Sequence, residues 1–222
     1  QHYKMIFPTM KSPGSIMQIG EIQFFLDDAG TTGLLAGSDP IVAVDETPTP
    51  AGWSGSSFPG GETPGNGIDQ VRNAMGQNST KYLNFGEERS GIIITNSGGP
   101  VQVNYMQLWT ANDAVERDPT SYRLEGTNDP ITSVQNSNSN GTETWTLISE
   151  GPLSLPGTLP NGVGDDFRFT ASGFIPVNAP QAFTSYRLVF QGVKDAAASN
   201  SMQIADIQFY TVIPEPGSIS LL

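Results

Sequence analysis

The sequence predicts an all-β protein, built as an antiparallel β-sandwich. Its 222 residues suit about one domain, and only 36% of them are hydrophobic. Glycine (25) and proline (17) are frequent, and they separate short apolar runs such as residues 91–95. No window of about 12 residues has the spacing of apolar positions that an amphipathic helix requires. Many short strands joined by long loops are typical of a sandwich.

Apolar runs predict strands along the whole chain. Residues 19–24 alternate apolar and polar side chains, which is the pattern of a half-buried strand. The other predicted strands are residues 41–44, 81–85, 91–95, 101–110, 121–126, 144–148, 167–169, 185–191 and 202–212. Polar loops rich in glycine, serine, proline and asparagine separate them, notably residues 47–67 and 133–140.

One segment of the sequence occurs twice. Residues 17–25 read MQIGEIQFF and residues 202–210 read MQIADIQFY, and the match extends back to residues 3–7 and 186–190. A repeat of this kind indicates a tandem array. We therefore expect closing strands of a preceding repeat at 1–27, a complete domain at 28–212, and the start of a C-terminal tail at 213–222. The first of these regions should form an edge strand, an exchange contact with another copy, or a poorly ordered arm.

Composition narrows the function classes. The formal charge of -12 disfavours nucleic acid and anionic membranes as partners, whereas surplus carboxylates suit Ca²⁺ or solubility. The chain has no cysteine, and its one histidine is His2, so we expect no disulfide, no cysteine-based zinc site and no serine-histidine-aspartate triad. No apolar stretch of about 18 residues predicts a membrane span. We expect a protein that is not an enzyme.

Several motifs together resemble the discoidin-like, galactose-binding-type jelly roll, which includes coagulation-factor C domains and many bacterial carbohydrate-binding modules. The motifs are YRLEGTND at 122–129, WTLI at 145–148, YRLVF at 186–190 and IADIQFY at 204–210. TKYLNFG at 80–86 and TANDAVERDP at 110–119 are similar to a narrower bacterial subgroup. The resemblance covers about residues 39–212 and implies a jelly-roll sandwich.

A second resemblance lies near the end of the sequence. Residues 212–218, VIPEPGS, are similar to the start of the PEP-CTERM sorting signal of Gram-negative bacteria. The hydrophobic helix and basic cluster that follow in that family are not in this sequence. The resemblance implies a secreted protein attached to the cell surface or the extracellular matrix.

The discoidin-like resemblance also implies a structural Ca²⁺ site. In related modules the metal lies where a turn meets the last strand, and NGID at 66–69 matches that turn. The implied ligands are Asp69, Thr80 and Asp206, whose hard oxygen atoms suit Ca²⁺. The alternative is that Asp69 only caps a turn. Residues 70–79 lengthen the path between the first two ligands, and Gln70 stands where the family usually has glycine.

Sugar binding would require exposed aromatic faces, because the CH groups of a pyranose stack on aromatic rings as apolar groups do. Trp53 and Phe58 in the long loop are candidates, whereas we expect Trp109 and Trp145 in the core. The most charged stretch of the chain adds Asn112 and Asp113 as candidate ligand contacts. The alternative for this stretch is structural, with Arg117 pairing with Asp113 or Asp118 to hold the loop.

The sequence therefore predicts a non-catalytic extracellular module of a tandem-repeat surface protein. Its expected partners are a glycan or matrix polysaccharide and the neighbouring repeats. Two alternatives remain open: a purely structural spacer of a surface array, and an accessory domain of an exported enzyme.

Overall fold

A computed structural model describes most of the chain's strands and the turns between them. The described residues are 2–7, 16–27, 30–37, 41–45, 64–67, 81–84, 90–95, 100–111, 113–130, 144–157, 169–183, 185–190 and 192–211. Among them the structure is β-rich, with short 3-10 turns and no α-helix. Within these residues, no helix is long and apolar enough to span a membrane.

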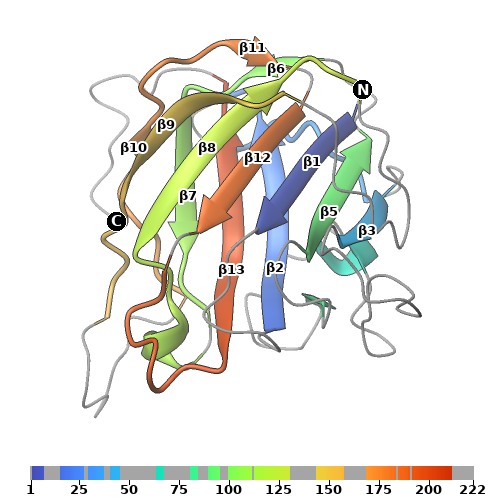
Figure 1. The fold of residues 1–222 in the computed structure, drawn as a ribbon. Helices are drawn as coiled ribbons and strands as arrows, with labels where there is room; N and C mark the ends of the chain where they lie inside the picture. Colours follow the sequence, from blue (N-terminus) through green and yellow to red (C-terminus); the bar gives the residue numbers. More distant parts are fainter. Residues whose placement is uncertain are drawn as a thin grey trace.

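The strands occur in nearly the order that the sequence predicts (Figure 1). They are β1 His2–Phe7, β2 Ile16–Phe25, β3 Ile41–Asp45, β4 Tyr82–Asn84, β5 Ser90–Thr95, β6 Val101–Gln102, β7 Tyr105–Trp109, β8 Ser121–Thr127, β9 Thr146–Pro152, β10 Ile175–Pro176, β11 Ala182–Phe183, β12 Ser185–Phe190 and β13 Ser201–Tyr210. The 3-10 turns are η1 Pro64–Gly67 and η3 Val115–Arg117. The short strands β10 and β11 were not expected from the sequence.

The strands form several sheets, and the largest has five strands in the order β10-β7-β13-β2-β4. Smaller sheets are β1-β5-β3, β12-β8-β9 and β11-β6. In Figure 1, strands β8, β12, β1 and β5 run side by side and pass in front of β13 and β2. Strand β1 hydrogen-bonds with β5 on one side and lies next to β12 on the other.

The five-stranded sheet is mixed, because β2 and β13 run parallel. The sequence predicted antiparallel strands throughout, and the difference arises where the repeated segment pairs with its own copy. The pairing is in register: Met17 lies opposite Met202, Ile22 opposite Ile207 and Phe24 opposite Phe209. Parallel neighbours need a long connection, and most of the chain separates these strands.

Strand β2 is an internal strand of this sheet, with β13 on one side and β4 on the other. Strand β2 is therefore not an edge strand or a loose arm, two of the three arrangements expected for residues 1–27, whereas β1 is the end strand of the β1-β5-β3 sheet. The apolar side chains Ile19, Ile22 and Phe24 of β2 belong to the same hydrophobic core cluster as buried side chains from the other described strands. It stays a prediction that residues 1–27 end a preceding repeat. The other expected region boundaries also stay predictions.

The core contains apolar side chains from both copies of the repeat. The Phe24 and Phe209 rings stack with their centroids 4.9 Å apart, and Tyr186 lies 6.4 Å from Phe24. The buried Tyr186 hydroxyl accepts the Val103 N–H at 3.2 Å and lies 2.9 Å from the Val101 carbonyl oxygen. These contacts lie where the single predicted strand 101–110 is divided into β6 and β7. The two parts have different partners, since β6 pairs with β11 whereas β7 pairs with β13.

A substitution in β2 tests whether this strand carries part of the core. Ile22→Ala removes a side chain that is fully buried, so the free energy of unfolding should fall by about 2–5 kcal/mol. Leu26→Ala is the matched control, because Leu26 follows the same strand but is 46% exposed. Chemical denaturation measures both variants. Equal, small losses would show that β2 is not part of the core.

Candidate functional site

The structure places only some of the residues that the sequence singled out. The predicted positions Trp53, Phe58, Asp69, Thr80 and Asn112 lie outside the described residues. Asp113 and Asp206 are described, and they lie in different settings. Asp113 has a side chain that is 58% exposed, in the loop before η3, whereas Asp206 is fully buried in β13.

Asp206 belongs to an ordered set of side chains on the face of the five-stranded sheet that points away from the core. On β7, Met106 and Leu108 enter the core, so the alternate residues project to this outer face. The same holds on β13 around Ile207 and Phe209, and on β2 around Ile22 and Phe24. We call the resulting set the outer grid; it comprises Tyr105, Gln107 and Trp109 on β7, Asp206, Gln208 and Tyr210 on β13, and Glu21, Gln23 and Phe25 on β2.

The strand register sorts the outer grid into rows of similar chemistry. The first row is aromatic, with Tyr105 opposite Tyr210 and Tyr210 opposite Phe25. The Phe25 and Tyr210 rings stack at 5.7 Å between centroids. Phe174, which precedes β10, meets Tyr210 edge-on at 5.2 Å and Tyr105 at 6.4 Å. Such contacts fix the orientation of the ring faces.

The second row contains glutamine amides. Gln107 lies opposite Gln208, which lies opposite Gln23. The Tyr210 hydroxyl donates to Gln208 Oε1 at 2.6 Å, and Gln107 Nε2 donates to the Ser172 carbonyl oxygen at 2.8 Å. Within the row, amides therefore hold both the aromatic rings and the neighbouring backbone in place.

The third row joins Trp109 to two carboxylates. Trp109 lies opposite Asp206, and Asp206 lies opposite Glu21. Gln208 Nε2 donates to Asp206 Oδ2 at 2.7 Å, so the amide row and the acidic row are linked. Asp206, predicted as a calcium ligand, thus has Glu21 as its neighbour on the next strand. No group of three or more histidine, cysteine, aspartate or glutamate side chains in the described ranges could hold a metal ion.

The outer grid is open toward β7 and covered toward β2. Tyr105, Gln107 and Trp109 are half-buried, whereas the grid residues on β13 and β2 are buried. Residues 30–36 fold back over β2: Gln23 Nε2 donates to the Leu35 carbonyl oxygen, and Gln23 Oε1 accepts the Leu35 N–H at 2.9 Å. A ligand would therefore reach the grid from the β7 side.

Asp27 shapes this return segment. Its carboxylate accepts the backbone N–H of Thr31 at 2.9 Å and that of Thr32 at 2.6 Å. The Thr31 hydrogen bond, together with Thr32, lowers the pKa of Asp27 from 3.8 to about 2, although burial acts in the opposite direction. The charged form is the one that the fold prefers, so its stabilising effect is present above pH 3.8 and is lost as the pH falls toward 2.

A buried ion pair lies in the loops near the N-terminal end of β13. Lys194 Nζ donates to Asp118 Oδ2 at 3.2 Å, and Asp118 is fully buried. The same ammonium lies 2.7–3.1 Å from the carbonyl oxygens of Leu155, Pro156 and Gly157. Lys194 therefore connects the loop after η3, the segment after β9 and the loop that leads into β13.

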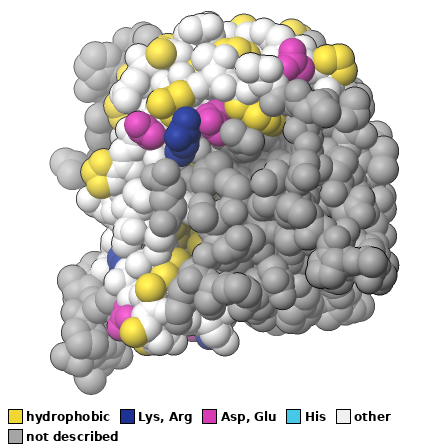
Figure 2. Space-filling view, viewed as in Figure 1, with side chains coloured by type: hydrophobic (Ala, Val, Ile, Leu, Met, Phe, Trp, Pro, Cys, Tyr) yellow, Lys and Arg dark blue, Asp and Glu magenta, His cyan; other side chains and the backbone are white. Residues whose placement is uncertain are grey.

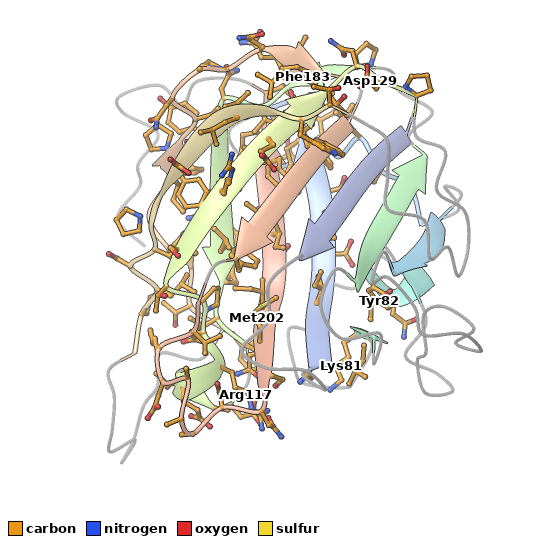
Figure 3. The ribbon with its side chains drawn as sticks, in the orientation of Figure 1. Lys81, Tyr82, Arg117, Asp129, Phe183 and Met202 are labelled. Atoms are coloured by element: carbon orange, nitrogen blue, oxygen red, sulfur yellow. The ribbon has the colours of Figure 1, made fainter. Side chains whose placement is uncertain are left out.

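The charged loop expected near Asp113 is held by structural contacts. Arg117 Nη1 lies 3.8 Å from Asp113 Oδ1, and Arg117, the last residue of η3, is labelled near the bottom of Figure 3. Gln203 Nε2, from β13, donates to the carbonyl oxygens of Asp113 and Ala114. Asp118 pairs with Lys194. Of the two partners expected for Arg117, the ion pair within this loop is therefore the one with Asp113.

Among the described, coloured side chains of the face seen in Figure 2, charged groups are few and mixed in sign. Arg123 on β8 pairs with Glu125 at 3.1 Å and lies opposite Glu150 on β9. On the described part of this face, no basic patch is present that would attract a polyanion.

Sequence reasoning missed the outer grid and the role of Lys194. Trp109 and Trp145 were expected in the core, but both are half-buried, and Trp109 lies on the opposite face from Met106 and Leu108. The alternation of Tyr105, Gln107 and Trp109 was a signal that could have identified this column of the grid. The neighbouring columns depend on which strands pair, and that information is not in the spacing.

The comparisons with known proteins leave the family open. No protein-family model matches the chain, and no curated protein matches it. The outer grid and the loops around Asp118 and Lys194 are therefore interpreted from their own chemistry.

Removing the Lys194 ammonium tests the buried ion pair. Lys194→Met leaves the Asp118 carboxylate buried without the Lys194 cation, so the free energy of unfolding should fall by about 3–5 kcal/mol. Arg117→Met is the control, because its partner Asp113 is largely exposed and such pairs contribute about 0–1 kcal/mol. Adding Asp118→Asn to the Lys194 variant should recover part of the loss. Similar effects of the two single variants in urea denaturation would contradict this assignment.

Proposed function

We propose that this chain is a non-catalytic extracellular module that binds glycan or matrix polysaccharide within a tandem-repeat surface protein. The β-rich fold and the motifs that resemble discoidin-like domains support this class, in which the sheets would form a jelly-roll sandwich. The single observation that carries the proposal is the outer grid. It presents aromatic rings, amides and carboxylates side by side, with its β7 column half-buried.

This chemistry suits a sugar polymer. Tyr105 and Trp109 lie at either end of the β7 column and offer ring surfaces to the CH faces of pyranoses. Gln107 lies between them; one N–H of its amide donates to the Ser172 carbonyl oxygen, and the second N–H can donate to a sugar hydroxyl. A strand repeats its same-face side chains every two residues, about 6.6 Å apart. The column therefore forms an extended row, which fits a linear chain better than a single small molecule.

The described acid groups support a binding role over a catalytic one. Asp118 is paired with Lys194, Asp113 with Arg117, and Asp27 caps its own loop. Asp206 and Glu21 lie opposite each other on paired strands and are both buried, which limits the access of a substrate to either carboxylate. Export and surface attachment are supported by the resemblance of residues 212–218 to a sorting signal.

Binding to polysaccharide tests the proposal. The purified chain should retain a linear polysaccharide on an affinity gel or a glycan array, with weak affinity because an open row buries little of each sugar. Tyr105→Ala and Trp109→Ala should each weaken binding by about 3- to 10-fold, since each removes one stacking face. No glycosidase, esterase or protease turnover is expected.

Trp53→Ala is the matched comparison, because Trp53 was the loop candidate from the sequence. If only Trp53→Ala weakens binding, the loop rim is the glycan site and the outer grid is not. If no variant and no polysaccharide gives a signal, the spacer function becomes the better account. Circular dichroism of each variant confirms that the fold is intact.

We also propose that Ca²⁺ stabilises the module as a structural ion, with Asp69, Thr80 and Asp206 as ligands. The donor chemistry fits, because Asp206 carries a carboxylate and its strand neighbour Glu21 adds another. Once bound, the ion would connect the turn at 66–69 to β13.

Calcium titration tests this site. An ion that binds only the folded state should raise the melting temperature, and a hundredfold excess over Kd corresponds to about 2.7 kcal/mol. Asp69→Ala should abolish the rise, whereas Asp113→Ala should leave it unchanged because Asp113 is exposed and lies in another loop. An unchanged melting temperature in about millimolar Ca²⁺ would remove the site and leave Asp69 as a turn residue.

A further inference from the structure

The edge of the five-stranded sheet next to β7 contains one extra residue. Strand β10 pairs Ile175 with Met106, and an isolated bridge pairs Ala171 with Trp109. From 171 to 175 the edge advances by four residues, whereas from 106 to 109 strand β7 advances by only three. Two residues of the edge therefore lie opposite one residue of β7, which is a β-bulge. We call residues 171–175 the bulged segment.

The hydrogen bonds around the bulge show where the extra residue lies. The Ser172 N–H donates to the Leu108 carbonyl oxygen at 2.7 Å, and the Leu108 N–H donates to Ser172 Oγ at 3.1 Å. The same hydroxyl donates to the Gly173 carbonyl oxygen at 2.8 Å. Ser172 is thus matched to Leu108, so Gly173 and Phe174 share the place opposite Gln107. The Gln107 amide donates to the Ser172 carbonyl oxygen and completes the support.

The bulge sets which side chains the edge adds to the outer grid. The Phe174 ring meets the two tyrosines of the aromatic row. At the other end of the bulged segment, Ala171 lies opposite Trp109 and so shares its face. Between these two ends lies Gly173, which is exposed and has no side chain. The strip beside the Gln107 amide is therefore open, with aromatic rings at both of its ends.

The fold itself does not require glycine at position 173. A Cβ added there meets nothing within 4 Å, and φ does not lie in the left-handed range. Gly20 on β2 differs, because a Cβ there would overlap the carbonyl oxygen of Ala205. Glycine in an extended segment is destabilising relative to alanine, since it has more conformational freedom to lose on folding. A glycine with neither reason in the fold is typical of a place where a ligand approaches the backbone closely.

We infer that Gly173 is a specificity-determining residue of the polysaccharide site, an inference that rests on the proposed function. Because Gly173 has no side chain, one sugar ring can lie against the backbone of the bulged segment, within reach of the Gln107 amide. The sugars on either side then meet Trp109 and the aromatic row. Tyr105 and Trp109 are four residues apart on β7, or about 13 Å at roughly 3.3 Å per residue, so the open strip lies between two stacking surfaces.

The charges near the strip favour a neutral polymer. The described residues 100–111 and 169–183, which include β7 and the bulged segment, contain no lysine or arginine. The buried carboxylates of Asp206 and Glu21 lie in the same row as Trp109. A uronic acid polymer would bring further carboxylates toward this row, with no cation among those residues to offset the repulsion. The substrate class is therefore a neutral linear polysaccharide.

Filling the space at Gly173 tests the inference. Gly173→Val places a rigid side chain over the strip, so it should weaken binding of a soluble neutral β-glucan by about tenfold. Gly173→Ala adds only a Cβ and should weaken binding by less. Ala182→Val is the matched control, because it adds a β-branched side chain to an exposed position of β11, in another sheet. Chemical denaturation should show that Gly173→Val is as stable as the unmodified chain.

A single thiol at the same place provides a second measurement, because the chain has no cysteine of its own. In Gly173→Cys, the neutral β-glucan at about ten times Kd should slow maleimide labelling by about tenfold, since only the free fraction reacts. Leu147→Cys is the matched control, because Leu147 is 41% exposed on β9 and its labelling should not change. Polygalacturonate, a uronic acid polymer, should slow neither reaction.

The outcomes separate this inference from the proposed function. If Tyr105→Ala and Trp109→Ala weaken binding while Gly173→Val does not and the thiol is not protected, the inference is wrong and the proposed function stands. If the unmodified chain binds neither polymer, the proposed function fails and this inference fails with it. Equal or tighter binding of polygalacturonate would contradict the neutral substrate class. If Gly173→Val does not fold, the labelling of Gly173→Cys decides the question.

Discussion

The structure depends on the in-register pairing of β2 with β13. Both strands shift the side that faces the core at the same point, from Ile19 to Ile22 in one and from Ile204 to Ile207 in the other. Because the shift is shared, apolar side chains from both strands stay on one face and polar side chains on the other. A slip of one residue would bring Gln23 or Gln208 into the core. The core and the outer grid are thus two consequences of one register.

The loops around Asp113 and Asp118 depend on β13 and on the loop that precedes it. Gln203, near the start of β13, binds the backbone of Asp113 and Ala114, and Lys194 in the preceding loop binds Asp118. Ala114 has a left-handed backbone with φ of 52°, a conformation that needs support from its surroundings. Lys194 aligns with Lys11 in the first copy of the repeat, so the sequence carries this residue twice.

How much could be predicted from the sequence differs between levels of structure. Alternation and turn residues predicted most strands, and the β-rich fold is confirmed. Alternation also tells which residues of one strand share a face, but it cannot tell which strands are neighbours. The repeat was visible, yet its two copies were expected apart, and the structure places them side by side. Trp109 was misjudged for this reason, because whether its face meets the core depends on a partner strand that the spacing does not reveal.

The outer grid and the repeat are physically linked, because β2 supplies one column of the grid and covers it. Strand β2 therefore also sets the shape of the outer grid, leaving the β7 column half-buried and the β13 column buried. Under the proposed function, the half-buried β7 column would bind a sugar chain weakly. Units connected in an array would raise the effective concentration of the next column, so that weak contacts add to firm attachment when the spacing matches the polymer.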